Sequence, residues 1–121
     1  MLITHIAAAA LGAGVVALGA REAIAPRAAA RGYGVPVAPD LPPTPYLSVK
    51  ANRDVALGAL LVLVAYTSPP VVVAATLGIA SICPVWDAAL VLRYGRPRDA
   101  VIHAATAVYA LVAALFALGG H

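Results

Sequence analysis

Ionisable residues run directly into a long apolar segment in the middle of this chain, and this limits the folds that the chain can adopt. Lys50, Arg53 and Asp54 are followed by apolar sequence that continues to Ala65. A charge at bilayer depth costs about 2.5–3.5 kcal/mol on insertion scales, so such groups usually face a bundle interior and have partners. The residues after Asp54 are too few for a membrane span, which needs about 20 residues. The helix must therefore begin before Lys50, and Lys50 and Asp54 are spaced to share charge along one face.

The composition is that of a membrane protein. Of 121 residues, 63% are hydrophobic and 11% are charged, whereas soluble domains are about 45–50% apolar and about 25% charged. The mean hydropathy is +0.93. A chain of this length makes one small domain, which we expect to cover residues 1–121 and to lie in the bilayer. The single cysteine, Cys83, excludes an intrachain disulfide.

Four apolar runs are long enough to cross a bilayer as helices. We expect the spans at about 3–20, 47–67, 71–92 and 100–118. Ser68-Pro69-Pro70 predicts a tight reversal, and Pro84 predicts a kink in the third span because proline lacks a backbone donor. The predicted fold is all-α: an antiparallel bundle of four transmembrane helices with one Pro-rich cytoplasmic loop.

The loop at 21–48 is predicted to contain a short helix and a Pro-rich connector. Its prolines break any long helix, but residues 23–31 could form a short interfacial helix, with Tyr33 and Tyr46 placed as interface aromatics. The Pro-rich part is expected to be a semi-rigid connector or a lid. In the first span, Ala8/Gly12 and Ala10/Gly14 have the spacing that allows close helix contact.

The basic residues predict the orientation of the chain. The loop Arg21–Lys50, the turn Arg93–Arg98 and Arg53 together hold all eight Lys and Arg residues, and four spans place them on one side. The positive-inside rule then puts both termini outside and the basic connections in the cytoplasm, with the plasma membrane as the expected location. Because topology accounts for every basic residue, the net charge of +3 does not indicate nucleic-acid binding.

Four polar residues are predicted to share one layer near the cytoplasmic face: Arg53, Asp54, Asp87 and His103. Counting about 1.5 Å per helical residue places them roughly 5–10 Å below the interface. In a purely structural reading, Arg53 pairs with Asp87, Asp54 pairs with Lys50, and His103 bonds to a backbone carbonyl. Asp99 could also orient the imidazole from the membrane edge.

The alternative reading gives these four residues a catalytic role. Two carboxylates with an arginine and an imidazole could form an acid/base site for a hydrophobic small molecule, of the epoxide hydrolase, cyclase or isomerase type. No cofactor is expected, and no metal, because the sequence lacks a Cys pair or an H-x-x-E motif. A helper subunit that scaffolds a larger complex is a third reading. The expected partners are the lipid bilayer and a hydrophobic ligand, and homo-oligomerisation is left open.

Three segments of the chain contain short polar motifs: Tyr46-Leu47-Ser48-Val49-Lys50-Ala51-Asn52-Arg53-Asp54-Val55-Ala56-Leu57-Gly58, Pro84-Val85-Trp86-Asp87-Ala88-Ala89-Leu90-Val91-Leu92 and Ile102-His103-Ala104. These segments resemble the family of small four-helix membrane proteins known as domain of unknown function 4267. The family pattern has a glycine where Ala51 stands here. The resemblance implies a four-span fold and recurring polar positions at Arg53, Asp54, Asp87 and His103. It implies no established reaction.

Overall fold

The computed structural model describes residues 2–35, 38, 40 and 44–119, and this part of the chain is helical without strands. The long helices are α1 (Leu2–Ile24), α3 (Thr44–Thr67) and α6 (Ala100–Leu118). The third apolar run forms α4 (Pro70–Ala80) and α5 (Ile82–Tyr94). A short helix, α2 (Pro26–Tyr33), follows α1, and a 3-10 turn, η1 (Pro97–Asp99), precedes α6.

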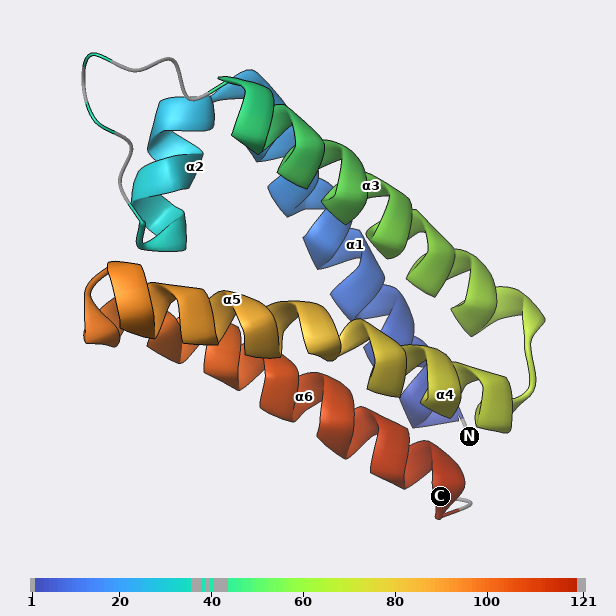
Figure 1. Cartoon of the computed structure of the whole chain (residues 1–121). Helices are drawn as coiled ribbons and strands as arrows, with labels where there is room; N and C mark the ends of the chain where they lie inside the picture. The colour runs from blue at the N-terminus through green and yellow to red at the C-terminus, as the bar shows by residue number, and fades with distance from the viewer. Residues whose placement is uncertain (1, 36–37, 39, 41–43, 120–121) are drawn as a thin grey trace.

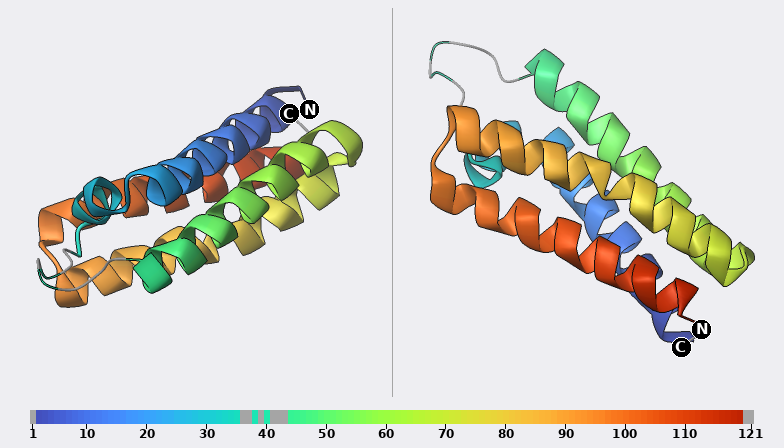
Figure 2. Two further views of the ribbon diagram at one scale, coloured as in Figure 1. Left: turned by 90° about the horizontal axis from the view of Figure 1, so that it is seen from above. Right: turned by 60° about the horizontal axis from the view of Figure 1, so that its bottom comes forward.

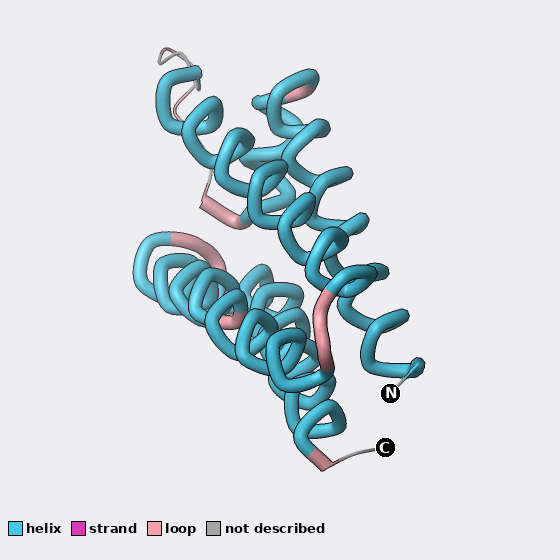
Figure 3. Tube along the Cα trace, turned by 90° about the vertical axis from the view of Figure 1, so that its right-hand side faces the viewer, coloured by secondary structure: helices cyan, strands magenta, loops and turns pink. Residues whose placement is uncertain are grey.

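The helices form two antiparallel layers. The layers meet at one end of the molecule, the closed end, and separate at the other, the open end. Helix α1 packs along α3, and α6 packs along α4 and α5 (Figure 1). Seen from the side, these are two separate pairs joined by the turn between α3 and α4 (Figure 3). The start of α1 and the end of α6 lie at the closed end in all views (Figure 2). Helix α2 folds back into the open end, between the two layers.

Among the described residues, three helical segments are long and apolar enough to cross a membrane: Leu2–Ile24, Pro70–Tyr94 and Pro97–Leu118. Large apolar side chains are exposed along them, among them Ile6, Ile79, Trp86 and Leu115. A monomeric soluble protein rarely exposes so much contiguous apolar surface, whereas lipid covers it at no cost. Helix α3 has 24 residues but carries Lys50, Arg53 and Asp54 in its first half.

The helix boundaries differ from the predicted spans mainly at the open end. Helix α1 ends at Ile24 rather than at Ala20, and Glu22 in this added turn is paired with Lys50 within the bundle. Helix α3 begins at Thr44 rather than at Leu47. Helix α6 has the predicted bounds of 100–118. The short helix predicted at 23–31 forms as α2, shifted to Pro26–Tyr33.

The third run is interrupted at Ser81, one turn before Pro84. Proline at 84 has no N–H to donate to the carbonyl of Ala80, so the ladder of hydrogen bonds loosens there. With this break, the described part of the chain contains six α-helices, whereas four spans and one short helix were predicted. Much of the Pro-rich loop, at positions 36–37, 39 and 41–43, lies outside the described residues, as does the side chain of Tyr46.

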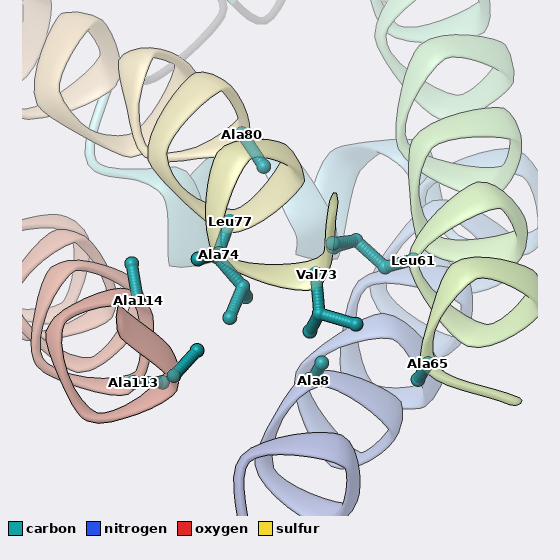
Figure 4. Close-up of a cluster of buried hydrophobic side chains, with 10 residues drawn as sticks. Ala8, Leu61, Ala65, Val73, Ala74, Leu77, Ala80, Ala113 and Ala114 are labelled. Carbon is teal, nitrogen blue, oxygen red and sulfur yellow. The ribbon is translucent and has the colours of Figure 1, made fainter. Parts of the chain in front are cut away.

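The core at the closed end is built from small side chains. Val73 and Leu77 of α4 are completely buried between the two layers (Figure 4). Alanines of α1, α3 and α6 surround them, including Ala8, Ala65 and Ala113. Because alanine adds little width, the layers approach closely here, and the larger separation at the other end leaves room for α2 and for a cavity.

Small residues also hold α1 against α3. A Cβ atom added at Gly19 would lie 2.7 Å from Val55 Cγ2 and 2.8 Å from the carbonyl oxygen of Ala51, so only glycine fits. Of the two predicted small-residue pairs, Ala8/Gly12 lies in this buried contact. Gly14 is exposed, with no atom within 4 Å of an added Cβ.

Candidate functional site

A buried lysine joins the end of α1 to the start of α3. Lys50 Nζ donates to Glu22 Oε1 and, at 2.6 Å, to Asp54 Oδ2. Each of these three side chains is no more than 10% exposed. Removing charges from water is costly unless they are paired and hydrogen-bonded. Lys50 meets this condition by sharing its charge between two carboxylates from different helices.

Arg53 connects Asp54 to Asp87 across the two layers. Its Nε lies 3.3 Å from Asp54 Oδ1, and its Nη2 lies 3.7 Å from Asp87 Oδ2 on α5. The Arg53 side chain is 45% exposed, whereas that of Asp87 is 13% exposed. The arginine therefore reaches the two carboxylates from the rim, and the carboxylates lie deeper.

Tyr33, the last residue of α2, holds that helix in the opening. Its hydroxyl donates to Asp87 Oδ1 at 2.9 Å, and its carbonyl oxygen lies 2.9 Å from His103 Nε2 on α6. The tyrosine and histidine rings meet edge to face, with centroids 4.8 Å apart. Lys50 Nζ lies 5.2 Å from the centroid of the tyrosine ring, within reach of a cation–π interaction. One residue therefore contacts α3, α5 and α6.

The chain leaves Tyr33 through Gly34, which caps α2 in the left-handed region at φ 100°. A Cβ at this position would lie 2.6 Å from Asp99 Cβ. Gly34 therefore satisfies both a backbone requirement and a packing requirement. This tight contact between the end of α2 and the turn before α6 fixes the position of Tyr33.

A cavity of about 230 Å³ lies beside these groups, between the two helical layers. Its polar end is formed by Glu22, Tyr33, Lys50, Asp54, Asp87 and His103, with Arg21 at the edge. The rest of its wall is mainly apolar, and includes Leu11, Val15, Leu18, Leu57, Leu61, Ala80, Cys83, Pro84, Ile102 and Ala110. A mainly apolar pocket with a few convergent polar groups is the usual form of a small-molecule site.

The four predicted site residues occupy different places relative to the cavity. Asp54, Asp87 and His103 line it, whereas Arg53 contacts the two carboxylates but is not among the lining residues. His103 has no direct contact with Arg53 and reaches the cluster through Tyr33. Asp99 pairs with Arg96, at 2.9 Å, and the imidazole is held instead by the Tyr33 carbonyl.

Sequence reasoning missed Glu22 and Tyr33 as members of the site. Glu22 is the only glutamate of the chain and directly follows the predicted first span, a position in which an acidic residue can turn inward. Tyr33 was assigned to the membrane interface, but it is 7% exposed and lies inside the bundle. No sequence signal distinguishes these two locations, because they depend on how α2 folds back.

The cluster carries one more carboxylate than it has cations. Glu22, Asp54 and Asp87 contact only Lys50 and Arg53 as charged partners in the described part of the chain. Glu22 Oε2 is buried and has no hydrogen-bond partner among the described residues. An unsatisfied buried acceptor costs about 1–3 kcal/mol. The surplus of negative charge, rather than this inaccessible oxygen, suits the polar end of the cavity to a group that donates a hydrogen bond.

The same side chains do not form a metal site. Within the described ranges, no three His, Cys, Asp or Glu side chains are grouped so that they could hold a metal ion. The described carboxylates contact lysine, arginine and tyrosine donors instead of converging on one point.

Comparison with known proteins identifies a family and no closer relative. No curated protein and no solved structure matches the chain. One family model matches residues 12–117 and so includes every residue that lines the cavity except Leu11. The chain belongs to the family described as a domain of unknown function, DUF4267.

Proposed function

We propose that this chain is a membrane protein with four spans that binds a hydrophobic small molecule in the cavity between its helix layers. The observation that carries this proposal is the cavity itself, which has apolar walls and a buried charged end. A protein that serves only as a scaffold needs no such space, because a filled interior is more stable. The proposal counts α3 as the fourth span, since Lys50 and Asp54 are paired inside the bundle and face no lipid.

The distribution of charge supports an orientation. The basic residues of α2, of the start of α3 and of the turn before α6 lie at the open end of the bundle (Figure 1). Under the positive-inside rule this end faces the cytoplasm and both termini lie outside, with the plasma membrane as the proposed location. The cavity would then open close to the cytoplasmic interface.

The bound molecule would be divided between the two ends of the cavity. Its apolar part would contact residues such as Leu11, Leu57 and Leu61, and its polar group would lie against Glu22 and His103. Burial of apolar surface gives about 25 cal/mol per Å², which favours binding but does not select between ligands. Selection would come from the few polar groups.

Filling the cavity tests this function. Cys83→Phe places a ring in the cavity wall, and Val85→Phe places the same ring at an exposed position of the same helix. Both variants and the wild type are purified from native membranes, and the bound molecules are extracted and identified by mass spectrometry. We expect a molecule enriched over bulk lipid in the wild type and in Val85→Phe but lost from Cys83→Phe. Equal recovery from all three proteins would reject the cavity as the binding site.

A second candidate is acid/base catalysis on the same kind of molecule. The observation in its favour is that Arg53 lies between two carboxylates, 3.3 Å from Asp54 and 3.7 Å from Asp87. For an epoxide, one carboxylate would take a proton from the attacking water while a carboxyl group gave one to the opening oxygen, and the product would be a diol. Asp54 would be the ionised carboxylate, because it lies closer to Arg53 and also contacts Lys50, and Asp87 would be the acid.

Replacement of Asp87 separates catalysis from binding. Asp87→Asn keeps the size of the side chain and an acceptor for the Tyr33 hydroxyl, and it removes the charge. A set of lipophilic epoxides is incubated with wild type and variant, and the gain of one water is followed by mass spectrometry. Catalysis predicts turnover by the wild type and its loss in a folded Asp87→Asn protein. If the wild type converts none of them but still retains a ligand, the site binds without this reaction.

A further inference from the structure

A second hollow lies on the outer side of the bundle, between α1 and α6. Its volume is about 410 Å³, and it is more open than the inner cavity. Its wall is formed by Ala10, Leu11, Gly14, Val15, Leu18, Ala105, Thr106 and Tyr109. The Thr106 hydroxyl donates to the carbonyl of Ile102, 2.8 Å away, so its hydrogen-bonding need is met within its own helix. This outer groove therefore presents an almost entirely apolar surface to the lipid.

The outer groove and the inner cavity share part of their walls. Leu11, Val15, Leu18 and Thr106 line both. The inner cavity alone, at about 230 Å³, is below the range of about 300–1,000 Å³ that ligand sites usually have. The combined volume of the inner cavity and the outer groove lies within that range. A molecule held at the polar end would thus extend past these shared residues and into the groove.

The polar cluster and the outer groove lie at different depths in the membrane, as the head and the chain of a lipid do. Gly14 lies near the middle of α1, whereas Glu22 lies in its last turn at the basic end. At about 1.5 Å per residue, the groove is about 12 Å deeper in the membrane than the polar cluster. A molecule with its head at Glu22 and its chain at Gly14 would lie as lipids of that leaflet lie, head toward the interface and chain toward the midplane.

We propose that the outer groove and the inner cavity form one site for a single-chain membrane amphiphile that enters sideways between α1 and α6. This deepens the proposed function and rests on it. The head of the amphiphile donates a hydrogen bond, as an alcohol or an ammonium group does, because the described cluster at the polar end of the cavity has three carboxylates for two cations. Arg21, at the edge of the cavity, is exposed and so weakens this preference little.

A hydrogen bond between α6 and α1 closes the groove on the side away from the charged cluster. The hydroxyl of Tyr109, which lines the groove, donates to the carbonyl oxygen of Ala7, 3.1 Å away, and so links α6 to α1 at the end of the groove away from Glu22. A chain that enters from the lipid meets this link on one side and the charged cluster on the other. The opening between the two is the stretch that contains Gly14 and Ala105.

Cys83 makes this route measurable, since it is the only cysteine of the chain and lines the inner cavity. The protein is reconstituted into phosphatidylcholine vesicles, and the rate of Cys83 modification by a membrane-dissolved pyrene maleimide is followed by fluorescence. Gly14→Phe fills the groove without a backbone clash, because an added Cβ at Gly14 has no atom within 4 Å. Gly78→Phe is the matched control, since Gly78 has the same free space and lines neither hollow.

We expect Gly14→Phe to slow the modification at least fivefold and Gly78→Phe to leave the rate unchanged. Equal rates in all three proteins would refute entry between α1 and α6. That result would leave the proposed function standing, because the loss of ligand from Cys83→Phe does not depend on the route. A negative result for the entry route therefore does not reject the proposed function, and the two proposals can be rejected independently.

Protection of Cys83 tests the chemical class of the ligand. Oleyl alcohol, oleylamine and oleic acid have the same chain and different heads, and each is added to the vesicles before the maleimide. We expect the alcohol and the amine to slow the wild-type reaction several-fold more than the acid does, with Glu22→Gln reducing the difference. If oleic acid protects as well as the others, the assignment of a donating head is wrong.

Discussion

Gly12 and Gly58 face each other where α1 crosses α3, each against the other's backbone. A Cβ on Gly12 would lie 2.7 Å from the carbonyl oxygen of Gly58, and a Cβ on Gly58 would lie 2.5 Å from that of Gly12. Such close approach sets the distance between the two helices. It thereby sets the distance at which Lys50 of α3 reaches Glu22 of α1.

Gly58→Ala should therefore destabilise the protein, although alanine is the better helix former. The new methyl group would meet backbone atoms of Gly12 and Val16, which cannot move without displacing α1. We expect a loss of about 1–3 kcal/mol in unfolding free energy, as in other overpacked contacts. Unfolding by a denaturing detergent, followed by circular dichroism, measures it.

Gly14→Ala is the control for this change. It makes the same substitution on α1 with no atom within 4 Å of the new Cβ. Helix propensity alone predicts a gain of up to about 1 kcal/mol. If the two variants had equal stability, the contact between Gly12 and Gly58 would not be the one that holds α1 to α3.

Lys50→Met should be among the most destabilising single substitutions. It keeps the apolar stem and removes the one cation shared by Glu22 and Asp54, which leaves two carboxylates close together in a buried place. Breaking a buried ion pair in this way costs about 3–5 kcal/mol. The variant Arg98→Met, at an exposed side chain, should lose less than about 0.5 kcal/mol in the same assay. Recovery of stability by Lys50→Met combined with Glu22→Gln would show that the surplus negative charge is the cause.

The sequence was sufficient to predict the part of the fold that depends on local pattern. Apolar run length predicted the long helices, and α6 has its predicted bounds. The spacing of Lys50 and Asp54 predicted their contact, because residues four apart on a helix are neighbours. Counting along each helix predicted one polar layer, and within it Arg53 contacts Asp54 and Asp87.

The contacts made by α2 could not be predicted in the same way. Tyr33 contacts Asp87 and His103, which are 54 and 70 residues away in sequence, and no periodic pattern relates them. Their meeting depends on Gly34, whose left-handed conformation redirects the chain. The inward position of Glu22 likewise depends on the close packing of glycines between α1 and α3.

Tyr33→Phe should loosen α2 while leaving the long helices in place. The variant keeps the ring against His103 and loses the hydrogen bond to Asp87, which is worth about 0.5–1.5 kcal/mol. Hydrogen exchange of the amides in α2 measures the effect, and we expect faster exchange there than in the wild type. Tyr109→Phe also removes a tyrosine hydroxyl but at the other end of the bundle, so it should leave exchange in α2 unchanged.

The proposed topology predicts which connections react on each side of the membrane. In a Cys83→Ser background, Thr67→Cys lies at the end of α3, next to the turn into α4, and Arg96→Cys lies in the basic turn before α6; both positions are exposed. Four spans with outer termini put the first position outside and the second in the cytoplasm. Intact cells treated with a membrane-impermeant charged maleimide should therefore label only the Thr67→Cys protein, and lysed cells should label both. If only the Arg96→Cys protein were labelled in intact cells, the orientation would be the reverse of the proposed one. If both proteins were labelled in intact cells, α4 and α5 would not cross the membrane.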